Sequence, residues 1–97
     1  MVEKIRALWE KHESSPIPLG FRSIVIDGLT LTQIHCDIAA NILTFINTGG
    51  HLGSHRVSAL TKSKLKIEKS IETIPQATKS YLNNLKQISD LVLQQVQ

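Results

Sequence analysis

The sequence predicts a mainly helical α+β domain with an N-terminal helix, one β-hairpin at about residues 21–34 and three further helices. Two observations lead to this prediction. Apolar residues recur at three- and four-residue spacing, as in amphipathic helices, and one Asp-Gly pair lies between two alternating apolar runs, as in hairpins. The length of 97 residues suits a single domain spanning residues 1–97. An all-α arrangement of four helices is the alternative.

The first helix is predicted from residue 2 to about residue 13. Its apolar stripe at helical spacing consists of Val2, Ile5, Leu8, Trp9 and His12. We interpret His12, beside Trp9, as a partly covered core position, with a pH-sensing role as the alternative. Residues 14–20 contain two prolines, which remove backbone donors and fix φ, so this segment is expected to be an extended connector.

The hairpin prediction depends on Asp27 and Gly28, which can both take the positive φ angles of a type I′ turn. The turn fixes the register. The predicted facing pairs are Ile26 with Leu29, Val25 with Thr30, Ile24 with Leu31, Ser23 with Thr32, and Arg22 with Gln33. We prefer a second strand followed by a helix that Asp37 caps, although residues 30–36 also fit a helix that begins at Thr30.

The second and third helices are placed by their end signals. The glycine pair Gly49-Gly50 suits the C-terminal end of the second helix. Ser54 can cap the third helix, predicted at about residues 55–73. One lysine, Lys64, interrupts its apolar stripe, and we interpret it as an edge residue whose ammonium group reaches water.

The last helix is predicted at about residues 76–95, after a break at Ile74-Pro75. Its apolar arc is the widest in the chain. Because so wide an arc must be covered on two sides, we expect this helix at the centre of the core or in an oligomer interface.

Composition and charge narrow the class of protein. Hydrophobic residues make up 41% of the chain and charged residues 20%, which is typical of a globular protein, and the net charge of +3 is below that of a dedicated DNA-binding domain. A single cysteine, Cys36, excludes an intramolecular disulfide and indicates a reducing compartment. No apolar run is long enough to span a bilayer, so we expect a cytoplasmic protein without membrane partners.

The sequence offers weak candidates for metal binding and catalysis. A zinc site could be drawn from His35, Cys36, His51 and His55, but their spacing does not match structural zinc motifs, and we expect no metal or cofactor. Cys36 also lies between His35 and Asp37, an order that resembles a nucleophile with catalytic helpers. Neighbours in sequence point in divergent directions, so we expect no enzymatic activity.

Two groups of residues are candidates for contacts. For an anion or an acidic partner, the candidates near the start of the third helix and along it are Ser54, His55, Arg56, Lys62, Lys66 and Lys69. For a dimer, they are Val25, Thr30, Tyr81, Leu85 and Val92. The sequence therefore favours a small non-catalytic protein-interaction or regulatory module acting as a homodimer. The alternative is a weak nucleic-acid or acidic-partner binder that uses the basic helix 55–69.

Overall fold

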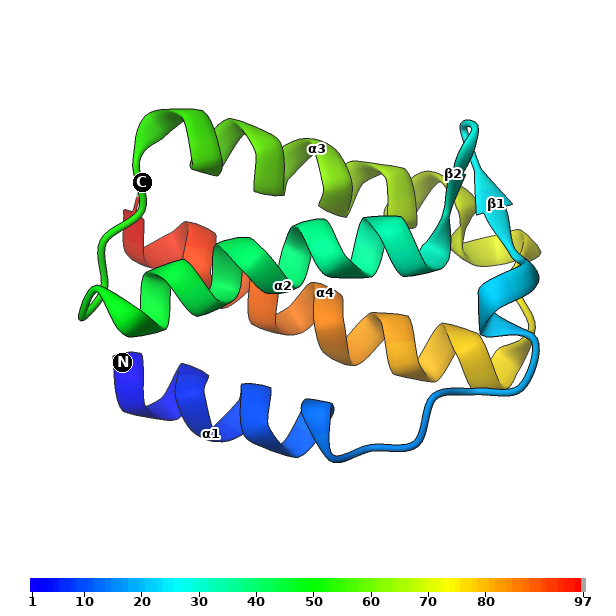
Figure 1. The fold of residues 1–97 in the computed structure, drawn as a ribbon, viewed down its shortest axis with the longest axis horizontal. Helices are drawn as coiled ribbons and strands as arrows, with labels where there is room; N and C mark the ends of the chain where they lie inside the picture. The colour runs from blue at the N-terminus through cyan, green and yellow to red at the C-terminus, as the bar shows by residue number, and fades with distance from the viewer. Residues whose placement is uncertain (97) are drawn as a thin grey trace.

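The computed structural model describes residues 1–96, which form an antiparallel bundle of four helices with a short hairpin at one end (Figure 1). The helices are α1 (Val2–Glu13), α2 (Leu31–Asn47), α3 (Ser54–Ser70) and α4 (Gln76–Val96), and the strands are β1 (Val25–Ile26) and β2 (Leu29–Thr30). Two 3₁₀ turns, Phe21–Ser23 and Ile71–Thr73, precede β1 and α4. The predicted fold class, mainly helical α+β, is confirmed.

The four helices enclose one core, and α2 and α4 each contact all the others. The inward side chains of α4 include Leu82, Leu85 and Val92, which are fully buried. The wide apolar arc of α4 is thus covered within the chain. The helix α4 takes a central position, as predicted, and α2, which has a similar set of buried residues, shares that position.

The turn and its nearest pairs agree with the prediction. Asp27 and Gly28 have φ angles of 50° and 80°, both in the left-handed region that a type I′ turn requires. The strands are antiparallel and pair Val25 with Thr30 and Ile26 with Leu29. Each strand is only two residues long, so the predicted hairpin span of 21–34 was too long.

The hairpin is short because α2 begins at Leu31, which corrects the preference for a longer second strand. Thr30 and Gln33 form a capping box: the Gln33 backbone N–H donates to Thr30 Oγ1 at 3.1 Å, and the Thr30 N–H donates to Gln33 Oε1 at 2.9 Å. Once α2 starts here, the predicted pairs of Ser23 with Thr32 and Arg22 with Gln33 cannot form.

Two predicted helix caps were also wrong. Asp37 lies inside α2 and is exposed, so it caps nothing. At α3 the N-cap is Gly53, in an extended conformation and without a side-chain hydrogen bond, and Ser54 is the first helical residue. The glycine pair does end α2 as predicted, and a Cβ on Gly50 would lie 3.1 Å from Val2 Cγ2, so the loop passes close to the start of α1.

Five ring side chains pack together at the hairpin end of the bundle, where the connector of residues 14–20 leads into the 3₁₀ turn. They are Trp9 and His12 from α1, Phe21 from the 3₁₀ turn, His35 from α2 and Tyr81 from α4. The Phe21 ring meets the Tyr81 ring edge-on, with centroids 5.5 Å apart. Within residues 1–96, no helix is long and apolar enough to cross a membrane.

Candidate interaction surface

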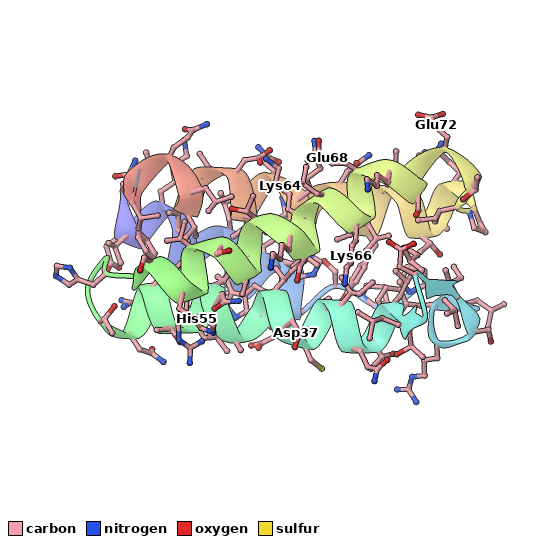
Figure 2. The ribbon with its side chains drawn as sticks, turned by 90° about the horizontal axis from the view of Figure 1, so that it is seen from above. Asp37, His55, Lys64, Lys66, Glu68 and Glu72 are labelled. Atoms are coloured by element: carbon pink, nitrogen blue, oxygen red, sulfur yellow. The ribbon has the colours of Figure 1, made fainter. Side chains whose placement is uncertain are left out.

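The contact residues predicted along the third helix lie on the surface of α3. All six are exposed except Lys66, which is half-buried: Ser54, His55, Arg56, Lys62, Lys66 and Lys69. Five of them, all except Ser54, line two shallow hollows. We call these five, His55, Arg56, Lys62, Lys66 and Lys69, the basic face. Figure 2 shows Lys66 and His55 on the side of α3 that faces α2.

The first hollow lies between α2 and the N-terminal half of α3. Its lining residues are Asp37, Ala40 and Asn41 from α2 with His55, Arg56, Ala59 and Ser63 from α3. Three of its lining side chains are small, at Ala40, Ala59 and Ser63. They leave the groove between the two helices open to a neighbouring side chain.

Arg56 is held in position above this groove by a buried amide. Asn41, which is only 5% exposed, donates from Nδ2 to the Asp37 carbonyl oxygen at 3.0 Å. Its Oδ1 then accepts from Arg56 Nη1 at 3.1 Å. A guanidinium group has five N–H donors in a fixed planar fork, so most of them stay available to an incoming carboxylate.

The second hollow lies beside the tip of the hairpin. Asp27 of the turn lines it together with Lys62, Leu65, Lys66 and Lys69 of α3. Leu65 is 48% exposed and lies among the three lysines. The arrangement offers an apolar contact surrounded by positive charge.

Two acidic residues near α3, Glu68 and Asp90, pair with lysines outside the basic face. Lys64 pairs with Asp90 of α4 and, at 3.8 Å, with Glu68, and Lys86 lies 3.9 Å from the same Glu68. The hydrogen bond to Asp90 is the main cause that raises the pKa of Lys64. Lys64 is therefore at the edge of the apolar stripe, as predicted, but its ammonium group is paired with carboxylates as well as reaching water.

The result is a separation of charge around α3. Lys64, Glu68 and Glu72 lie on the side away from α2, opposite to the basic face (Figure 2). In the described part of the chain, none of the basic-face residues forms an ion pair. An exposed cation that has no internal partner is free to bind an external anion.

The predicted dimer contacts are divided between core and surface. Tyr81, Leu85 and Val92 are buried inside the bundle, so the structure places them in the core and not on a surface open to a second copy. Val25 is 60% exposed and Thr30 is half-buried beside it. Only the hairpin pair is placed for such a contact.

The four residues of the hypothetical zinc site do not come together. His35 and Cys36 lie near the start of α2, at the hairpin end, whereas His51 and His55 lie at the other end of the bundle. No group of three or more His, Cys, Asp or Glu side chains within residues 1–96 is arranged to hold a metal ion.

Sequence reasoning missed Asn41, although a signal was present. Asn41 is the polar member of an otherwise apolar stripe that includes Ile34, Ile38 and Phe45. A polar residue at a core-facing position needs a hydrogen-bond partner from elsewhere in the fold, and that partner is Arg56.

Comparisons of the chain with protein-family models, with curated proteins and with solved structures find no match. The function therefore has to be inferred from the chemistry of the surface itself.

Proposed function

We propose that the protein is a small non-catalytic interaction module that binds an acidic segment of a partner protein on the basic face. The observation that carries the proposal is a group of cations without carboxylate partners in the described chain, gathered around the exposed Leu65. Charge complementarity would favour carboxylates from the partner. An apolar side chain of the partner, lying between those carboxylates, would contact Leu65.

A protein partner fits this surface better than a nucleic acid does. No Phe, Tyr or Trp side chain of residues 1–96 lines either hollow, so the small imidazole of His55 is the one ring there on which an unpaired base could stack. The net charge of +3 is also small for a nucleic-acid binder.

The spacing of the cations suggests the form of the partner. Arg56 and Lys69 are 13 positions apart on α3, which corresponds to about 20 Å along the helix axis. Lys62, Lys66 and Lys69 follow one another at four- and three-residue steps along one side. A partner helix of three to four turns with glutamates on one face would match this pattern.

Under this proposal the protein has no catalytic activity and works in a reducing compartment such as the cytoplasm. Cys36 is exposed, and its neighbours His35 and Asp37 lie at consecutive positions of α2, where successive side chains diverge by about 100°. This divergence argues against a nucleophile with adjacent helpers. The cysteine has no second thiol in the chain with which to form a disulfide.

A labelled synthetic peptide tests the acidic-partner proposal. The probe is a 16-residue helix-forming peptide with glutamates on one face and one leucine among them, and the control peptide has glutamine at each glutamate. We expect fluorescence anisotropy to show binding of the glutamate peptide that weakens as salt is added. The Lys62→Glu/Lys66→Glu variant should bind about tenfold more weakly, since two attractive surface pairs become repulsive.

The matched control is Lys4→Glu/Lys79→Glu, which changes the net charge equally but on α1 and α4. Equal weakening by both double variants, or equal binding of both peptides, would refute the proposal. Tighter binding of a mixed-sequence DNA duplex than of the glutamate peptide, at the same ionic strength, would replace it with the nucleic-acid alternative.

Self-association through the hairpin end is the second candidate function. It is favoured by exposed apolar side chains at this end of the bundle, namely Ile17, Leu19 and Val25. A dimer would double the chain mass of 10.8 kDa in light scattering, and Val25→Lys would restore the monomer mass. A monomer mass for the unmodified protein at high micromolar concentration would rule this candidate out.

A further inference from the structure

Two histidines from different helices, one buried and one half-buried, contact each other directly. The Nε2 atoms of His12 on α1 and His35 on α2 are 3.2 Å apart, so one carries the hydrogen and the other accepts it. The hydroxyl oxygen of Tyr81 on α4 lies 3.4 Å from His35 Nε2. His12 is only 3% exposed, so the pair is a polar link within the core between three helices.

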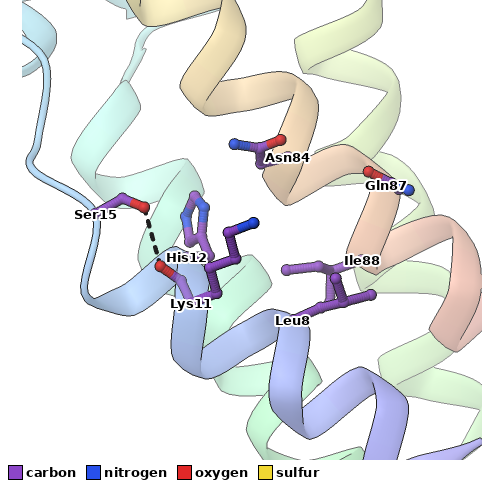
Figure 3. A pocket seen from close by; sticks show the side chains of 7 residues that line it. All are labelled: Leu8, Lys11, His12, Ser15, Asn84, Gln87 and Ile88. Carbon is purple, nitrogen blue, oxygen red and sulfur yellow. Dashed lines mark hydrogen bonds between the residues drawn. The ribbon is translucent and has the colours of Figure 1, made fainter.

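The pair lies beside a hollow between α1 and α4. This hollow of about 160 Å³ separates part of α1 from α4, and Figure 3 shows His12 and Lys11 at its α1 side. Leu8 and Ile88 supply its apolar wall. Because this stretch of the α1–α4 interface is incompletely filled, fewer apolar contacts oppose the separation of α1 here than in a close-packed interface.

No opposite charge is available to an imidazolium at this position. Lys11 is the ionisable side chain that accompanies His12 in the α1–α4 hollow. A separate hollow beside His35, next to the connector, presents Arg22, the Cys36 thiol and the Tyr81 phenol. Within residues 1–96, no carboxylate lines either hollow. A proton added to the pair would therefore place a positive charge in a buried, already cationic neighbourhood.

Protonation of both rings is incompatible with the observed contact. When both histidines are cations, both Nε2 atoms carry hydrogen, and the hydrogen bond becomes a repulsive contact between like charges. The other ring nitrogen of His12, Nδ1, has no hydrogen-bond partner in the described chain, so a proton there would find no acceptor. Burial, and secondarily His35, lowers the pKa of His12 from 6.5 to about 4, and burial lowers the pKa of His35.

We propose that the His12–His35 pair is an acid-operated clamp whose protonation releases α1 and the connector from α2 and α4. The open form takes up protons more readily than the closed form, so falling pH favours opening. For His12 alone, the ratio of open to closed protein should rise about 25-fold between about pH 7.5 and about pH 5. The clamp does not involve the basic face, so the two proposals can fail independently.

Hydrogen exchange of the full chain tests the clamp. Protection factors, corrected for the intrinsic pH dependence of exchange, are measured for α1 amides and, as an internal reference, for α3 amides. We expect α1 protection to fall about 25-fold or more between about pH 7.5 and about pH 5, while α3 protection stays nearly constant.

Two double variants separate the pair from other histidines. His12→Gln/His35→Gln keeps hydrogen-bonding side chains but cannot be protonated, so α1 protection should become independent of pH in this range. His51→Gln/His55→Gln, which alters two exposed histidines, should keep the pH dependence of α1 protection. Persistence of the pH effect in the first variant, or its loss in the second, would overturn the proposal.

A measurement on the unmodified protein covers the case in which the first variant does not fold. The histidine ring resonances give the titration midpoint of each ring by NMR. The proposal expects His12 to remain neutral until α1 protection begins to fall. A midpoint for His12 near 6.5 with unchanged α1 protection would overturn it, as would an equal loss of protection in α1 and α3.

Discussion

At the residue scale, the structure is shaped by a few polar groups placed among apolar ones. Asn41 and His12 both occupy core-facing positions of amphipathic helices, and each meets its partner from another helix. Spacing along the chain predicts that such a residue faces the core, as it did for His12. It cannot name the partner, because the partner lies 15 or 23 residues away and is brought near only by packing.

Replacing Asn41 by alanine tests the role of the buried amide. The change removes the acceptor of Arg56 and the donor to the Asp37 carbonyl, so we expect the free energy of unfolding to fall by about 1–3 kcal/mol. Arg56 should also lose its fixed position, which would weaken binding of the glutamate peptide. The control is Asn83→Ala at an exposed position of α4. Equal stability losses for the two variants in urea unfolding would contradict the assigned role.

At the scale of elements, the boundary between hairpin and helix shows what local patterns can decide. The Asp27-Gly28 turn and its two nearest pairs were predictable, because the turn requires positive φ at both positions. The next residues fit both a strand and a helix. The helix forms because Thr30 and Gln33 cap it and because α2 then buries its apolar stripe against the bundle, whereas a longer isolated hairpin would have only one partner strand.

A substitution at Thr30 measures how much the capping box stabilises this boundary. Thr30→Ala removes the oxygen that accepts from the Gln33 backbone N–H, so we expect a loss of about 1 kcal/mol in the free energy of unfolding. Thr32→Ala, at an exposed position in the first turn of the same helix, should have almost no effect. If both variants unfold at the same urea concentration, the capping box does not contribute as proposed.

At the scale of the whole molecule, the sequence predicted the number and order of the helices but not how they cover one another. The wide apolar arc of α4 indicated burial on two sides, which equally suits a core helix and an oligomer interface. The spacing of apolar residues predicts that a helix face is buried, but it does not identify the element that buries it. In the folded chain the other three helices cover it, and for this reason Leu85 and Val92 are in the core and not on a surface.

Truncation of Leu85 distinguishes a core residue from an interface residue. Its side chain is fully buried within one chain, so Leu85→Ala should lower the free energy of unfolding by about 2–5 kcal/mol, a large part of the stability of a small domain. The loss should be the same at low and high protein concentration, because no subunit contact is removed. Leu65→Ala, at an exposed position of the basic-face hollow, should change stability by less than about 0.5 kcal/mol. A destabilisation by Leu85→Ala that disappears at high protein concentration would instead place this residue in an interface between chains.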